Sequence, residues 1–267
     1  MGKVIVATGR GGTGKSTFCA ILSRYLAPPL LLIDVDPDQS LSDMLGINLE
    51  GEGIATVSEL VGDSREARRL GTQLYFDELE ASLYRNCVYR GEGFHLLTLG
   101  TKWTEGCYCR EDNSLKGIIP RLIAEYRSVV IDSPSGLEHL NRRVVSHVDI
   151  LFVLSDPSLK SVKHVERMKR IMEEVGISCQ CLFVVENYEF DEAAGSHLDT
   201  WGEGYLGKID YDANVRGYNL DGRSLWELPE DSAACLSVKK LLARIQEFDK
   251  CRLEVRQELS GEIRHDT

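Results

Sequence analysis

The sequence predicts an α/β protein built on a single doubly wound, mainly parallel sheet flanked by helices. Short apolar runs rich in Val, Ile and Leu alternate with helix-length amphipathic stretches. Continuous apolar runs of this kind are typical of strands buried on both faces of a parallel sheet. A glycine-rich loop joins the first run to the first helical stretch. This alternation of strand and helix implies right-handed crossovers within one sheet.

The expected elements follow this alternation along the whole chain. Strands are expected at residues 4–8, 30–35, 94–99, 128–132, 150–154 and 181–185. Helices are expected at residues 15–26, 161–175 and 237–248. In the second of these helices, Val162, Val165 and Met168 keep the three- and four-residue spacing of one apolar face.

One domain is expected over residues 1–250, followed by a charged tail at 251–267. Residues 48–93 interrupt the alternation with Gly-rich and charged sequence, so we interpret them as a peripheral insertion that serves interface or partner contacts. A short helix is indicated there at residues 77–83, and no clear strand.

Composition excludes several classes of protein. The 267 residues are 43% hydrophobic, which excludes a disordered chain. The formal charge of −11 argues against a general nucleic-acid binder, because such proteins neutralise phosphates. No apolar run approaches the ~20 residues of a membrane span, and the N-terminus lacks signal-peptide features. We therefore expect a cytoplasmic protein with reduced thiols, no nucleic-acid partner and no membrane anchor.

Residues 9–17, with the sequence GRGGTGKST, match the phosphate-loop pattern G-x-x-x-x-G-K-[ST] between a strand and a helix. Glycines let successive backbone N–H groups turn toward phosphate oxygens, and the helix N-terminus favours the same negative charge. Lys15 is expected to reach the β- and γ-phosphates, and Ser16 to bind Mg²⁺. The sequence therefore predicts an Mg²⁺-dependent ATPase of the P-loop class. The nucleotide-binding residues expected here are Gly11, Gly12, Thr13, Gly14, Lys15, Ser16 and Thr17.

Carboxylates follow two of the expected strands. Asp34 and Asp36 end one strand and Asp132 ends another, at the carboxyl edge where open α/β sheets bind ligands. We expect Asp132 to hold a water on Mg²⁺, and Asp34 to support either Mg²⁺ or the loop itself. Carboxylates at strand ends are also common turn formers, which is the alternative for Asp34 and Asp36.

The Arg10-Gly11-Gly12 stretch and the Asp34–Asp38 turn resemble the deviant Walker A ATPases of the MinD, ParA and nitrogenase iron protein group. That resemblance implies a homodimer in which Arg10, at the position of a signature lysine, reaches the partner's nucleotide. It also implies that Asp36 orients the attacking water, so Lys15, Asp36 and Arg10 form the catalytic set. Asn187 would read the adenine. The alternatives are a solvated loop arginine at Arg10 and a turn-forming asparagine at Asn187.

Cys107 and Cys109 are separated by one residue, so in extended backbone both thiols face the same side. Two sulfurs per chain leave a metal site incomplete, whereas a two-fold dimer supplies four. Four thiolates suit tetrahedral Zn²⁺ or square-planar Ni²⁺. The alternative is a pair of buried structural thiols, which is also our interpretation of Cys179 and Cys181, placed at the start of an expected strand.

The segments at residues 106–109, 132–140 and 222–232, together with Asp212, resemble the CooC type of carbon monoxide dehydrogenase maturation ATPase. The resemblance implies an ATP-dependent homodimer that holds Ni²⁺ or Zn²⁺ through Cys107 and Cys109. Its client would be a nickel enzyme, either carbon monoxide dehydrogenase or acetyl-CoA synthase. Arg10 departs from the usual lysine, and Asp210 stands where a proline is usual.

A binding or scaffold protein with an inactive nucleotide site is disfavoured, because Lys15, Ser16, Asp36 and Asp132 are all present. Two other functions remain open. One is spatial regulation of the MinD or ParA kind. The other is ATP-dependent electron transfer through an interface iron–sulfur cluster, as in the iron protein.

Overall fold

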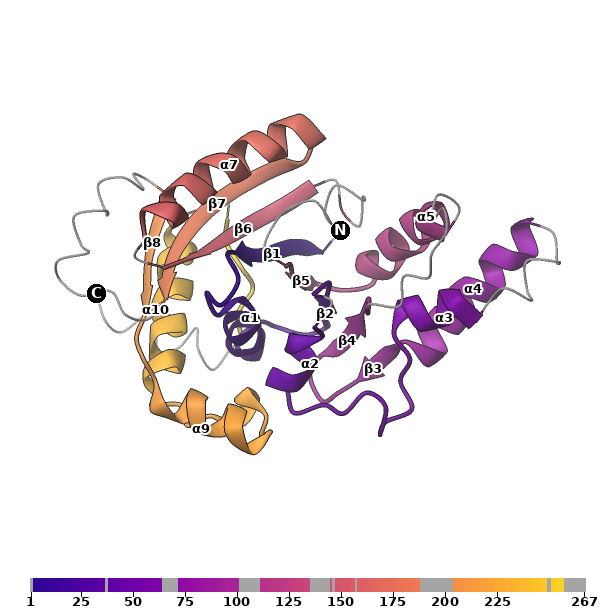
Figure 1. The fold of residues 1–267 in the computed structure, drawn as a ribbon, viewed down its shortest axis with the longest axis horizontal. Helices are drawn as coiled ribbons and strands as arrows, with labels where there is room; N and C mark the ends of the chain where they lie inside the picture. The colour runs from indigo at the N-terminus through magenta and orange to yellow at the C-terminus, as the bar shows by residue number, and fades with distance from the viewer. Residues whose placement is uncertain are drawn as a thin grey trace.

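The structure, a computed structural model, describes residues 2–36, 38–63, 72–100, 111–134, 145, 147–156, 158–187, 204–248 and 251–256. Within them the chain forms one sheet of eight strands in the order β3-β4-β2-β5-β1-β6-β7-β8. All neighbouring strands are parallel except β3, which runs antiparallel to β4. The prediction of a single, mainly parallel, doubly wound sheet is confirmed (Figure 1).

The strands are β1 (Lys3–Gly9), β2 (Leu30–Asp34), β3 (Val88–Arg90), β4 (His95–Thr98), β5 (Ser128–Asp132), β6 (His147–Ser155), β7 (Ser178–Asn187) and β8 (Tyr205–Ile209). The helices are α1 (Lys15–Arg24), α2 (Ser40–Met44), α3 (Val57–Asp63), α4 (Thr72–Asn86), α5 (Glu111–Ala124), α7 (Leu159–Val175), α9 (Ala213–Asp221) and α10 (Ala233–Glu247). A short 3₁₀ helix, η4, spans Leu225–Glu227.

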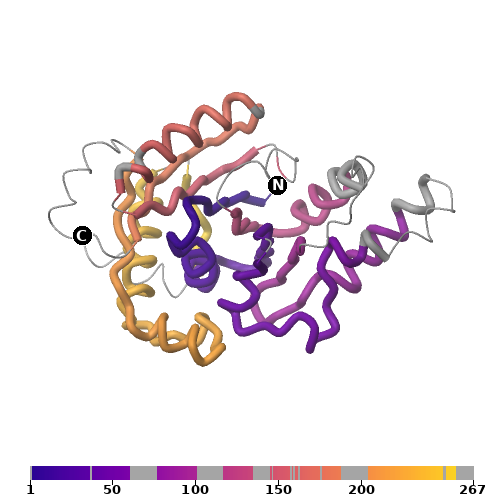
Figure 2. The backbone as a smooth tube through the Cα atoms, in the orientation of Figure 1, coloured from indigo at the N-terminus to yellow at the C-terminus, as the bar shows by residue number. Residues whose placement is uncertain are grey.

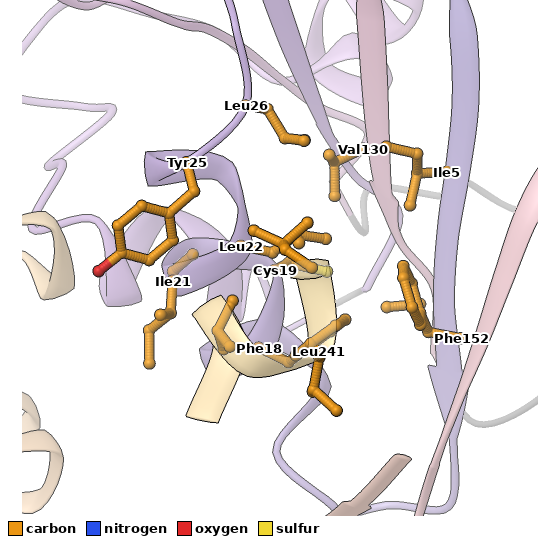
Figure 3. Close-up of a cluster of buried hydrophobic side chains, with 14 of the residues drawn as sticks. Ile5, Phe18, Cys19, Ile21, Leu22, Tyr25, Leu26, Val130, Phe152 and Leu241 are labelled. Atoms are coloured by element: carbon orange, nitrogen blue, oxygen red, sulfur yellow. The ribbon is translucent and has the colours of Figure 1, made fainter. Parts of the chain in front are cut away.

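Each face of the sheet has its own apolar core, because side chains alternate along a buried strand. In β1, Ile5 and Ala7 belong to one core, which α1, α2 and α10 cover. Val4 and Val6 belong to the other, which α4, α5 and α7 cover. Figure 3 shows the first core, where Phe18 of α1 meets Phe152 of β6 edge to face at 5.0 Å between ring centroids. The two cores hold the central strands and α1 in fixed positions.

The described parts of residues 48–93 lie at the end of the sheet that β3 forms, opposite β8 and α10 (Figure 2). The short helix indicated by the sequence at 77–83 lies within α4. The expectation of no strand there is wrong, because β3 pairs with β4. Only three residues long, β3 carries too few side chains to give an alternating pattern.

The segment 251–256 packs against the amino edge of the sheet. Val255 forms an antiparallel bridge with Leu26, and the amide of Ala27 donates to the carbonyl of Glu254 at 3.0 Å. Cys251 and Cys181 of β7 form a disulfide, 70 residues apart in sequence. The expectation of uniformly reduced thiols is therefore wrong for this pair, because folding brings β7 and the segment 251–256 together.

None of the helices in the described ranges has the length and apolar character to span a bilayer.

Candidate functional site

The carboxyl ends of the parallel strands bring the polar residues predicted from the sequence to one edge. In the sheet register, Asp132 of β5 pairs with Ala7 of β1 on one side and with Asp34 of β2 on the other. β1 therefore continues two residues beyond the level of both carboxylates, and the loop begins after it. This is the edge at which open α/β sheets bind ligands.

The phosphate loop follows β1 and ends at Gly14, the N-cap residue of α1. Gly14 has φ = +80°, and a Cβ there would collide with the side-chain amide of Asn187. That amide, at the end of β7, donates to the carbonyl of Thr13 at 2.7 Å. Asn187 therefore holds the phosphate loop through this hydrogen bond, which the sequence did not predict.

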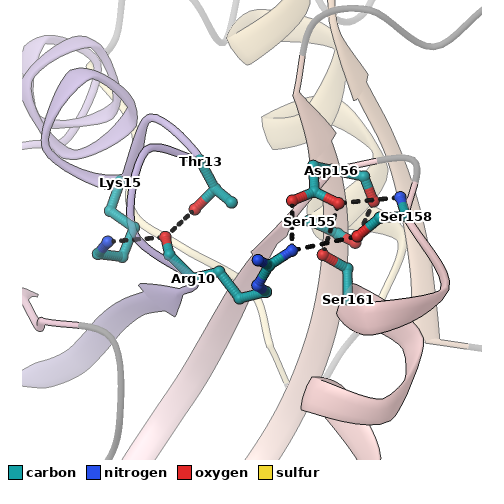
Figure 4. Close-up of polar contacts among 7 residues, drawn as sticks. All are labelled: Arg10, Thr13, Lys15, Ser155, Asp156, Ser158 and Ser161. Atoms are coloured by element: carbon teal, nitrogen blue, oxygen red, sulfur yellow. Dashed lines mark hydrogen bonds and ion pairs between the residues drawn. The ribbon is translucent and has the colours of Figure 1, made fainter.

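The loop closes on the carbonyl oxygen of Arg10. The ammonium of Lys15 donates to it at 3.1 Å and the Thr13 hydroxyl at 2.8 Å (Figure 4). Lys15 is only 7% exposed, so this cation is held at the start of α1. No side chain caps the N-terminus of α1, which leaves first-turn amides and the helix dipole directed toward an anion.

Asp132 is completely buried, and among the described residues neither of its carboxylate oxygens has a hydrogen-bond partner. Burial raises the pKa of Asp132 to about 6, and the charge of Asp36 acts in the same direction; the Ser16 hydroxyl and Lys15 act against the rise. A buried carboxylate with unused lone pairs, next to a serine hydroxyl, provides the hard oxygen donors that Mg²⁺ requires. These residues fit an Mg²⁺ site.

Asp34 is also buried, but both of its carboxylate oxygens have hydrogen-bond partners. Its oxygens accept hydrogen bonds from the amides of Asp36 and Leu41, at 3.0 and 2.9 Å. Burial and the neighbouring Asp132 raise the pKa of Asp34 to about 8, despite those bonds. Asp34 thus ties the loop after β2 to the sheet. Asp36 is half-buried in that loop, where it accepts from the amide of Asp38 at 3.0 Å.

Arg10 makes contacts that the sequence did not reveal. Its guanidinium donates to Asp156 at 3.0 Å and to the Ser158 hydroxyl at 3.1 Å (Figure 4). Asp156 directly follows β6, the neighbour of β1. An acidic residue after an apolar strand was the available signal, but only the strand order shows that it faces Arg10.

The other predicted binding residues also lie in or beside this loop. Gly11 and Gly12 are exposed at its tip, and Ser16 and Thr17 are half-buried in the first turn of α1. The hydroxyl of Thr17 contacts the sulfur of Met44 at 3.7 Å.

The predicted metal ligands Cys107 and Cys109 lie outside the described residues, as do residues 135–140 of the segment that resembles CooC. Across the described ranges, no three His, Cys, Asp or Glu side chains gather into a candidate metal cluster. The C-x-C metal site therefore stays a prediction from sequence.

Comparison with known proteins identifies the family of the chain. Residues 4–247 match the family model of the CobQ/CobB/MinD/ParA nucleotide-binding domain. An uncharacterized ATP-binding protein of Methanocaldococcus jannaschii is 31% identical over 257 residues, covering 91% of this chain and 98% of the relative. The carbon monoxide dehydrogenase accessory protein CooC of Rhodospirillum rubrum is 26% identical over 243 residues, covering 86% and 91%.

Among solved structures, the septum site-determining protein MinD of Pyrococcus horikoshii, complexed with Mg-ADP, superposes with a TM-score of 0.65. Its sequence identity is 20%, and the match covers 93% of this chain and 97% of that one. At this identity the likeness is one of fold.

Proposed function

The chain belongs to the CobQ/CobB/MinD/ParA family of nucleotide-binding ATPases, and within it we propose a homodimeric nickel chaperone that matures a nickel enzyme. The client is carbon monoxide dehydrogenase or acetyl-CoA synthase. The observation that carries this proposal is the Cys107-Tyr108-Cys109 motif in a chain with a phosphate loop. The similarity to CooC over most of both chains supports it.

In this proposal the ATP site is assembled from the carboxyl edge. Lys15 and the loop amides bind the phosphates, and Ser16 and Asp132 hold Mg²⁺. Because both oxygens of Asp34 accept backbone amides, we assign it to the support of the loop. Asp36 orients the water, and Arg10 acts on the partner's nucleotide, where a guanidinium can form charge-assisted bonds to two oxygens.

For Asn187, the contact with the Thr13 carbonyl supports a role in holding the loop. We keep adenine recognition as a second role, because an asparagine amide carries both a donor and an acceptor that a base can recognise.

The cargo in this proposal is Ni²⁺ or Zn²⁺, held by Cys107 and Cys109 from each subunit. Two thiolates per chain complete a four-sulfur site only in a dimer. Metal binding and dimer formation are then linked, so each strengthens the other by the same factor. The four thiols of this site must stay reduced to bind metal. A cytoplasmic location would keep them reduced, and we retain it as part of the proposal.

A second candidate is spatial regulation of the MinD kind, because MinD belongs to the same family of nucleotide-binding proteins. The two functions differ in what they do with metal. A MinD-like regulator has no need of Cys107 and Cys109, whereas the chaperone loses its cargo without them. Electron transfer, the third function considered from the sequence, would give an iron–sulfur absorption band after anaerobic purification.

The test is a titration with Ni²⁺ and with Zn²⁺ under reducing, anaerobic conditions, with the mass of the complex measured in parallel. We expect one tightly bound ion per two chains, and a dimer that forms with it. Cys107→Ser and Cys109→Ser should each abolish both effects while ATP still binds.

The matched control is Cys179→Ser. This thiol has the same C-x-C spacing, lies outside the disulfide, and has its pKa raised to about 11, chiefly by burial. Its replacement should leave the metal stoichiometry unchanged. One ion per monomer, or full binding by the Cys107→Ser/Cys109→Ser protein, would falsify the shared site.

A further inference from the structure

The side chain of Arg10 is bound within its own subunit. Its guanidinium pairs with Asp156 at 3.0 Å and with the Ser158 hydroxyl at 3.1 Å. The side chains of Arg10 and Asp156 are 37% and 35% exposed, so the pair is accessible to water without being fully solvated. Figure 4 shows this side chain extended away from the phosphate loop, toward the turn between β6 and α7.

Asp156 is itself fixed by the turn that carries it. One of its oxygens accepts from the amide of Ser158 at 2.9 Å and from the hydroxyl of Ser161 at 2.8 Å, at the start of α7. The other oxygen receives Arg10. Burial alone would raise the pKa of Asp156, but the bonds from Ser158 and Ser161 and the charge of Arg10 outweigh it and lower that pKa. The carboxylate is therefore a preorganised anion facing the arginine.

A guanidinium paired with this carboxylate is not available to a phosphate in a second subunit. The two anions are alternatives for the same cation. We propose that Asp156 and Ser158 form a retaining site that holds Arg10 within its own subunit. Arg10 must leave this site before two nucleotide-bound chains can pair, so the retaining site opposes dimer formation. Asp156 is then a positioning residue, which acts through Arg10. This inference rests on the role of Arg10 in the proposed function.

The size of the effect follows from the exposure of the pair. Partly exposed ion pairs contribute little to stability, so the retaining site opposes dimer formation only modestly. We expect Asp156→Asn to lower the dimer dissociation constant about two- to fivefold in Mg²⁺ and a non-hydrolysable ATP analogue. Asparagine keeps an oxygen for the bonds from Ser158 and Ser161 but loses the charge that holds Arg10. Ser158→Ala, which removes one contact and no charge, should shift the constant in the same direction by less.

The control is Glu227→Gln, which removes the same charge from a surface pair with Arg223 at 3.2 Å. It should leave the dimer dissociation constant unchanged. A double-mutant cycle distinguishes the proposed role of Asp156 from a purely structural one. Asp156→Asn should have no effect on the dimer dissociation constant once Arg10 is alanine.

The contact is also measured without any dimer. In the nucleotide-free monomer, Arg10→Ala should raise the pKa of Asp156, followed by the ¹³Cγ signal of its carboxyl group. An unchanged pKa would overturn the retaining site and leave the proposed function intact. If the pKa shifts but the dimer dissociation constant of Asp156→Asn is unchanged, the retaining site exists but does not oppose dimer formation, and the inference is overturned. If Arg10→Ala dimerises like the wild type, the trans role of Arg10 fails, and the inference fails with it.

Discussion

At the carboxyl edge of the sheet, as far as the structure describes the chain, Asp132 is buried without a hydrogen-bond partner and the Lys15 ammonium donates to a loop carbonyl. At the amino edge, the segment 251–256 is held by backbone hydrogen bonds and by the Cys181–Cys251 disulfide. The first edge leaves donors and acceptors free for a ligand, at a cost in stability. The second closes the chain on itself. Residues at the carboxyl edge are therefore expected to serve ligand binding, whereas residues at the amino edge stabilise the fold. Substitutions at the carboxyl edge should lower activity, and substitutions at the amino edge should lower stability.

The largest effect is expected at the carboxyl edge. Lys15→Ala should lower kcat for ATP hydrolysis by about 10²–10³-fold, because the developing phosphoryl charge loses its nearest cation. Steady-state phosphate release measures it. Lys169→Ala, an exposed lysine on α7, is the matched control and should hydrolyse ATP like the wild type. Turnover at the wild-type rate in Lys15→Ala would remove the phosphate loop from catalysis.

At the amino edge, the disulfide should contribute to stability and not to nucleotide binding. Its 70-residue separation predicts, on loop-entropy grounds, a loss of up to about 4 kcal/mol in the free energy of unfolding after reduction. Urea unfolding with and without reductant measures the loss. The Cys181→Ser/Cys251→Ser protein should be equally destabilised and insensitive to reductant. Alkylation of both thiols in the native, unreduced protein would show that the bond is not formed.

What the sequence could predict was local. Single strands and the residues next to them were enough to predict the phosphate loop, Asp34 and Asp132. Glycine spacing and apolar runs are properties of short segments. The ends of parallel strands meet at one edge, so placing these residues together needed no knowledge of strand order.

The features that the sequence could not predict join segments far apart in the chain. Arg10 meets Asp156 only because β6 lies next to β1, and Cys181 meets Cys251 only because the segment 251–256 lies at the amino edge. For Asp34, the sequence left open whether it serves Mg²⁺ or the loop. Its two backbone bonds are set by the path after β2, which residue types do not determine.

The third prediction concerns the stability of the protein without Mg²⁺. Burial raises the pKa of Asp132 from 3.8 to about 6, so between these values the folded state binds more protons than the unfolded state. The contribution of Asp132 to the free energy of unfolding therefore falls as the pH rises from about 4 to about 6, and stays low above. Asp132→Asn should raise stability above pH 6 by on the order of 2 kcal/mol while losing Mg²⁺-dependent hydrolysis.

Urea unfolding in EDTA across pH 4 to 8 measures this effect. The control, Asp43→Asn, removes an exposed carboxylate from α2 and should leave the pH profile unchanged. Adding Mg²⁺ should stabilise the wild type and not the Asp132→Asn protein. A variant less stable than the wild type at pH 8 would contradict the assignment of Asp132 as an uncompensated charge.

The smallest effect is expected for an ion pair at the amino edge. Arg127 and Glu254 approach to 2.8 Å, but their side chains are 51% and 63% exposed, so water and salt screen them. Glu254→Gln should cost less than about 1 kcal/mol and nothing measurable in 0.5 M salt, because the Ala27–Glu254 backbone bond remains. Leu253→Ala, one residue away and buried, should cost about 2–4 kcal/mol. If Glu254→Gln destabilised the protein as much as Leu253→Ala, charge rather than apolar contact would hold this segment in place.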